Sequence, residues 1–88
     1  MSPIDVVQFL KQQPFRPFRV TMVSGGSFDV KHPEFAIVTY SSCDIYNPSS
    51  IPGVAESRTT IGLNLIERID YLDELQPKSA GGNIQIGA

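Results

Sequence analysis

The chain has little of the residue types on which catalysis and covalent cross-linking usually depend. It holds one cysteine, Cys43, and one histidine, His32, and it has no tryptophan. A single thiol cannot form an internal disulfide, which excludes a scaffold held by its own disulfides. One histidine and one cysteine also do not supply an acid–base or nucleophile constellation. The sequence therefore predicts a protein that is not an enzyme and that needs neither a cofactor nor a metal.

Long apolar runs and a surplus of positive charge are also missing. No run approaches the ~18 apolar residues of a membrane span, and the first residues, MSPIDVVQF, lack a basic segment, so we expect no membrane association and a cytoplasmic location. The formal net charge is −2. Binding to duplex DNA usually rests on excess Lys and Arg that displace counterions, so the charge argues against duplex DNA as a partner and leaves single strands open.

The small size and low charge of the chain bear on its assembly. Its 88 residues allow one domain. A domain of this size buries only ~60–65% of the surface that its unfolded chain exposes, so its own core leaves it marginally stable. Charged residues make up 18% of the chain, below the ~25% of an average domain. A surface poor in charge tends to associate, and we expect a homo-oligomer.

Residues 2–13, SPIDVVQFLKQQ, have the pattern of a short amphipathic helix. Ser2 is a favourable N-cap, Pro3 suits the first helical position, and Asp5 places a carboxylate near the positive end of the helix dipole. Apolar residues occupy one broad arc of the helical wheel. Pro14 ends the helix. A helix of about twelve residues is marginal by itself, so it must dock on the rest of the domain.

Alternation of apolar and polar residues predicts five strands after the helix. The first two, residues 18–22 and 28–31, flank the SGGS of residues 24–27, where glycine allows the positive φ angles of a tight hairpin. A bend at residues 32–34 (HPE) follows, because Pro33 cannot donate to a ladder. The next elements are a strand over 35–40 that extends toward Tyr46, a loop over 47–57 and a strand over 58–65. One helical turn over 64–67 and a strand over 68–72 follow. The spacing of apolar residues in LIERIDYLDEL also fits a helix.

Five short antiparallel strands of this kind close most readily into a barrel, because closure removes exposed edges. The predicted fold is mainly β: a small, five-stranded, strongly bent antiparallel barrel, Sm-like or SH3-like, with an N-terminal α-helix. Residues 1–76 form this domain. Residues 77–88, PKSAGGNIQIGA, are rich in glycine, and we expect a disordered tail.

Two resemblances rest on these motifs. The run PFRPFRV, a turn, FDVKHPE, an apolar strand and LIERIDYL resemble a group of short uncharacterised bacterial proteins over residues 7–75, which implies no activity. The order of elements also resembles the Sm-like fold of LSm proteins and the RNA chaperone Hfq, which implies rings. KHPEF at residues 31–35 stands where the Sm-like pattern has its base-binding Asp-x-x-x-Asn, and Ile61-Gly62 stands where it has Arg-Gly.

The Sm-like resemblance implies where a ligand would bind. In such a barrel the bend at residues 31–35 and the turn at residues 62–64 meet beside the central pore. Lys31 would supply charge, His32 and Asn64 hydrogen bonds, and Phe35 a stacking face. The candidate ligand-binding residues are Lys31, His32, Glu34, Phe35, Gly62 and Asn64.

Each of these features also has a plain structural interpretation. His32 beside Pro33 suits a turn, and one histidine with carboxylates is a poor transition-metal site. Cys43 fits a small buried hydrophobe. The SGGS segment lacks the lysine of a phosphate-binding loop. Arg16 and Arg19, which flank Phe18, could form a basic face for single strands with Lys31. Asp29 is also placed to form an ion pair with Arg19 across the strands.

Two functional interpretations follow. The first is a non-enzymatic, ring-forming, Sm-like module that binds short single-stranded RNA or a protein partner. The alternative is a protein–protein adaptor or structural subunit with no nucleic-acid role. Resemblance of fold does not separate them.

Overall fold

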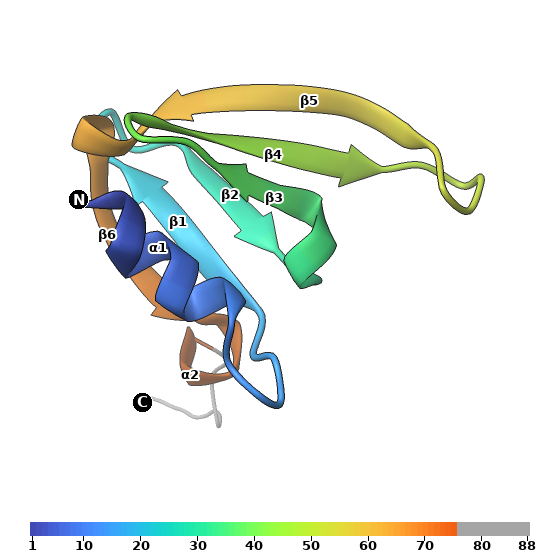
Figure 1. The fold of residues 1–88 in the computed structure, drawn as a ribbon, viewed down its shortest axis with the longest axis horizontal. Coiled ribbons are helices and arrows are strands. Elements are labelled where there is room, and N and C mark those ends of the chain that lie inside the picture. Colours follow the sequence, from blue (N-terminus) through green and yellow to red (C-terminus); the bar gives the residue numbers. More distant parts are fainter. Residues whose placement is uncertain (76–88) are drawn as a thin grey trace, which may run out of the picture.

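The computed structural model describes residues 1–75 and shows one N-terminal helix and two small sheets, with the helix beside the sheet that contains β1 (Figure 1). Within this range the sheets hold six strands. The tail predicted for residues 77–88 lies outside the described residues. The elements are α1 (Pro3–Leu10), β1 (Phe18–Met22), β2 (Ser27–Val30), η1 (Pro33–Phe35), β3 (Ala36–Val38), β4 (Ser42–Pro48), β5 (Ala55–Gly62), η2 (Leu63–Leu65), β6 (Ile66–Tyr71) and α2 (Leu72–Leu75), where η marks a 3₁₀ turn.

The N-terminal helix is confirmed, together with its cap. The Ser2 hydroxyl accepts a hydrogen bond from the Asp5 backbone N–H at 3.3 Å, and the Asp5 carboxylate accepts one from the Ser2 N–H at 3.2 Å. This reciprocal pair is a capping box. The helix ends at Leu10, earlier than predicted. Pro14 disfavours helical backbone at the residue before it, so the last predicted turn does not form.

The first sheet has the order β2-β1-β6 and contains the predicted hairpin. Val20 pairs with Phe28, and Thr21 pairs with Ser27. The chain reverses through a turn in which Gly25 has a φ of 100°. That conformation strains any residue with a Cβ, which explains the glycine at this position.

The second sheet has the order β3-β4-β5 and contains one more strand than was predicted for this part of the chain. One strand was predicted to run from residue 35 toward Tyr46. The chain instead reverses between β3 and β4, so that Val38 pairs with Cys43. The Thr39 hydroxyl accepts hydrogen bonds from the backbone N–H groups of Ser42 at 3.0 Å and Ser41 at 3.4 Å. Such local bonds from a threonine side chain stabilise turns, and this turn makes two strands of one.

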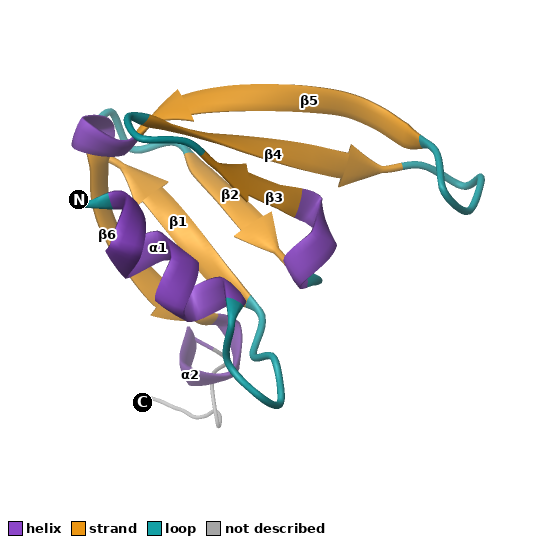
Figure 2. Cartoon of the chain, viewed as in Figure 1, coloured by secondary structure: helices purple, strands orange, loops and turns teal. Residues whose placement is uncertain are grey.

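The predicted five-stranded barrel is wrong. The six strands form two separate three-stranded antiparallel sheets, and no ladder in residues 1–75 joins β2 to β3 or β5 to β6. At both of those places the chain passes from one sheet to the other through a 3₁₀ turn, η1 or η2 (Figure 2). Pro33 begins η1 and has no N–H for a ladder. The sheets therefore meet at corners, and their edges stay open.

The loop predicted over residues 47–57 is shorter, because β4 continues to Pro48 and β5 begins at Ala55. Residues 46–58, which we call the arm, extend away from the body of the molecule (Figure 1). The radius of gyration is 14.6 Å, against about 12 Å for a compact chain of this length. A turn over residues 64–67 and a strand over residues 68–72 were predicted. The turn and the strand occur in this order one to two residues earlier, as η2 and β6, and Leu72 begins α2.

The core lies between the sheets, with α1 closing one side. Phe18, Ile45 and Val6 are almost completely buried. The ring of Phe9 lies 5.3 Å from that of Phe18 and 5.4 Å from that of Tyr71, which docks the helix on the first sheet. Aromatic pairs at this spacing add to the stabilisation from burial. The remaining core residues are Val20, Met22, Val30, Ala36, Cys43, Ile61, Leu63 and Ile66.

Candidate functional site

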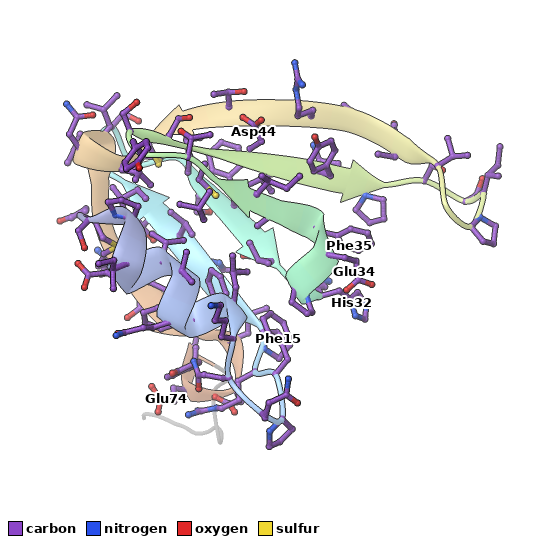
Figure 3. All side chains as sticks on the ribbon, viewed as in Figure 1. Phe15, His32, Glu34, Phe35, Asp44 and Glu74 are labelled. Atoms are coloured by element: carbon purple, nitrogen blue, oxygen red, sulfur yellow. The ribbon has the colours of Figure 1, made fainter. Side chains whose placement is uncertain are left out.

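The bend after β2 is the part of the predicted site that the structure assembles. The backbone N–H of Phe35 donates to the carbonyl of His32 at 3.1 Å, which closes the single turn of η1. The rings of His32 and Phe35 meet edge to face with centroids 5.4 Å apart. Figure 3 shows His32, Glu34 and Phe35 projecting together from this corner, on the side of the arm. His32 is exposed, as a turn residue would be.

A hollow of about 290 Å³ opens beside this bend. We call it the bend groove, and its lining residues are Asp29, Lys31, His32, Phe35, Tyr46 and Pro48. A second hollow of about 370 Å³ continues from it under the arm tip and shares Phe35, Tyr46 and Pro48 with it. Glu34, Ile51 and Val54 also line this second hollow. The two hollows adjoin at these three shared residues, and charged side chains line them together with rings and apolar groups.

Strand alternation brings Tyr46 into the groove. Cys43 and Ile45 of β4 are buried in the core. Successive side chains of a strand point to opposite faces, so Tyr46 faces away from the core. Ala36 pairs with Ile45, which places the preceding residue, Phe35, beside Tyr46 at the end of the ladder. The two rings therefore come from adjacent segments and share one face of the second sheet.

The charges around the bend groove nearly balance. Arg19 donates from Nε and Nη2 to the two carboxylate oxygens of Asp29, at 2.7 and 3.2 Å. The predicted ion pair between these strands is thus confirmed, and its hydrogen bonds hold the pKa of Arg19 above its ordinary value. Lys31 has no ionic partner within residues 1–75. Glu34 brings a carboxylate to the adjoining hollow.

Gly62 and Asn64 lie at the opposite end of the second sheet. Gly62 pairs with Ser42 at the start of β4, whereas the groove residue Tyr46 lies four positions further along that strand. Four residues of extended strand span about 13 Å. Asn64 belongs to η2, next to Gly62. Within one chain, the structure therefore groups Lys31, His32, Glu34 and Phe35 and leaves Gly62 and Asn64 apart from them.

The only cysteine is a core residue. Cys43 is 2% exposed, and burial, with a smaller contribution from the Asp44 carboxylate, raises the pKa of its thiol to about 11. The interpretation of Cys43 as a buried hydrophobe is confirmed. A thiol with this pKa is protonated near neutral pH, and the nucleophilic form of cysteine is the thiolate. No group of three or more His, Cys, Asp or Glu side chains suited to a metal ion occurs among the described residues.

Sequence reasoning missed Tyr46 and Pro48 as site residues. The signal that could have found them is the turn at Thr39–Ser41. In a single strand Tyr46 would share the buried face of Ala36, whereas the turn resets the alternation so that β4 buries Cys43 and Ile45. A larger apolar hollow of about 580 Å³ was also not predicted. It lies between α1 and the β3–β4 turn, where Ile4 is 68% exposed and Tyr40 95% exposed. Its lining is more apolar than that of the bend groove, and it holds none of the predicted site residues.

Two observations concern the chain as a whole. None of the helices in the described range is both long enough and apolar enough to cross a membrane. Comparison of the sequence with protein-family models and with curated proteins, and of the structure with solved structures, found no match.

Proposed function

We propose that this protein is a non-enzymatic binding module whose bend groove takes a proline-rich segment of a partner protein. The observation that carries the proposal is the pair of adjoining hollows that share Phe35, Tyr46 and Pro48. Grooves lined by aromatic rings bind polyproline II segments, since such segments are already extended and lose little entropy on binding. His32 and the Tyr46 hydroxyl add polar groups that can fix the orientation of a peptide backbone.

The charge of the groove favours a peptide over single-stranded RNA. Proteins that bind single strands combine stacking rings with a positively charged groove that follows the phosphates. Here Lys31 is the one cation in the lining of the bend groove, and Asp29 lies beside it. Glu34 lines the adjoining hollow, where a phosphate would meet a carboxylate. A neutral peptide segment meets no such repulsion.

The proposal contains no chemical step. The Cys43 thiol is buried and protonated, so it does not serve as a nucleophile. His32 packs edge to face against Phe35 at the surface, away from that thiol in the core. Recognition through rings, hydrogen bonds and one cation is what these side chains can supply.

Titration of the ¹⁵N-labelled chain with a decaproline peptide, followed by NMR, tests the proposal. We expect saturable shifts of the backbone amides of Lys31, Phe35 and Tyr46. A decamer of uridylate, titrated at the same ionic strength, should leave these amides unshifted. If the uridylate shifts them and decaproline does not, the groove binds nucleic acid and the proposal is wrong. The absence of shifts with either probe would equally contradict it.

A further inference from the structure

The strand β5 presents the longest open backbone edge in the described part of the chain. It has eight residues and lies at the outside of the second sheet, paired only with β4. The other edge strands are shorter: β2 has four residues, β3 three and β6 six. An uncovered edge of this length offers a row of N–H and C=O groups to another strand.

The sequence of β5 lacks two of the residue types that protect sheet edges. Its residues are AESRTTIG, so it contains no proline and no lysine, which are two of the features that natural proteins use to protect edges. Residues 55–58 are all exposed. The arm also holds this edge away from the body of the molecule, which leaves room for a second strand (Figure 1).

The charges of β5 are complementary to themselves. Glu56 and Arg58 flank Ser57, and neither has an ionic partner within residues 1–75. If two copies of β5 pair antiparallel about a two-fold axis at Ser57, Glu56 of each copy lies opposite Arg58 of the other. Opposite charges placed directly across a strand pair are stabilising, and a two-fold axis repeats the pair.

We propose that β5 pairs with β5 of a second copy of this chain about a two-fold axis at Ser57. The neighbouring registers are less favourable. An axis at Arg58 sets the two Arg58 side chains against each other, and an axis at Thr59 leaves both Glu56 and Arg58 opposite uncharged residues. The bulge in β5, where Asn47 pairs with Ser57 and Pro48 with Ala55, leaves Glu56 without a partner on β4.

This inference does not depend on the proposed function, but it has a consequence for it. An axis perpendicular to the sheet joins the two second sheets into one sheet of six strands. The same face of the second sheet in both copies then lies on the same side of the joined sheet. The two bend grooves open on the same side, where one partner carrying two segments could occupy both at once.

Sedimentation equilibrium of the full chain and of charge variants tests the dimer. The parent chain should show twice the monomer mass of 9.7 kDa. The single variants Arg58→Glu and Glu56→Arg place like charges at both symmetric positions, and each should raise the dissociation constant at least about tenfold, a change that corresponds to about 1.4 kcal/mol. The double variant carrying both changes restores the opposite pairs, and it should return the dissociation constant to within about threefold of the parent value. The matched control for Arg58→Glu is Lys11→Glu, which makes the same change of charge at the C-cap of α1 and should leave the dimer intact.

Disulfide cross-linking tests the register of the strand pair independently of the charge variants. Residues directly opposite in an antiparallel pair have Cα atoms about 4.5–5.5 Å apart, a distance that a disulfide spans. Ser57→Cys should therefore form a covalent dimer on oxidation, and Thr60→Cys, on the same strand, should not. A parent chain that stays monomeric, a double variant as weak as the single ones, or equal cross-linking at both positions would overturn the proposal.

Discussion

Two aromatic residues with similar chemistry have different surroundings in this molecule, and this difference allows a controlled test at the scale of residues. Tyr46 lines both hollows of the candidate site and is half-buried. Tyr40 stands at the β3–β4 turn with 95% of its surface exposed and lines neither of those hollows. Their replacement by alanine removes the same atoms from the candidate site in one case and from outside it, at the larger hollow beside α1, in the other.

Tyr46→Ala should weaken binding of the decaproline peptide by about 2 kcal/mol, because a central aromatic anchor usually dominates a small interface. The measurement is isothermal titration calorimetry. Tyr40→Ala is the control and should bind like the parent chain. Equal losses in the two variants, or no loss in Tyr46→Ala, would show that the groove is not the binding site.

The Cys43 thiol predicts a pH dependence of stability. Its pKa is raised to about 11 in the folded chain, from an ordinary value of 9.0. The folded state thus favours the protonated thiol, and the unfolded state loses its proton first as the pH rises. This contribution is fully present below pH 9 and is lost between pH 9 and about 11. Urea unfolding at several pH values should show a fall over this range that is smaller in Cys43→Ala. An equal fall in both chains would place its origin in other groups.

At the scale of elements, the β3–β4 turn decides the architecture. Three residues, Thr39–Ser41, separate two strands that the sequence pattern merges. The Thr39 side chain holds this turn through two backbone N–H groups. Because the turn starts a new strand, it determines the phase of β4, and with it the position of Tyr46 in the groove.

Thr39→Ala should lower the free energy of unfolding by about 1 kcal/mol, the usual net value of side-chain hydrogen bonds of this kind. Urea denaturation followed by circular dichroism measures it. Thr39→Ser keeps the hydroxyl and should recover most of the loss. If serine is as destabilising as alanine, the missing methyl group and not the hydrogen bond is responsible.

At the scale of the whole molecule, the shape of the chain leaves one sheet edge far from its core. The first sheet carries α1 and most of the aromatic packing, whereas the outer part of the second sheet extends into solvent as the arm. A dimer through β5 would bury the part of the molecule that gains least from the monomer core. It would also add to the stability of a domain of only 88 residues.

The rate of backbone hydrogen exchange should therefore depend on protein concentration only at the dimer interface. Raising the concentration should slow exchange of the β5 amides that face away from β4. Exchange in β2, which is also an edge strand, should not change. If exchange of the β5 amides does not depend on concentration although the chain sediments as a dimer, the interface lies elsewhere.

The local elements could be predicted from the sequence, because their causes lie within a few residues. The capping box at Ser2 and Asp5 fixes the start of α1, Gly25 permits the first hairpin turn, and Pro33 forces the bend. Four of the six predicted site residues, from Lys31 to Phe35, are neighbours in sequence, so their grouping follows from that bend.

The way in which these elements meet could not be predicted from the sequence. Sheet pairing depends on contacts between distant residues, and alternation along a strand does not state which strand lies beside it. The barrel prediction was wrong for this reason: η1 and η2 carry the chain between two sheets where a barrel needs continuous ladders. The same contacts brought Tyr46 and Pro48 to Phe35 and left Gly62 and Asn64 at the other end of β4.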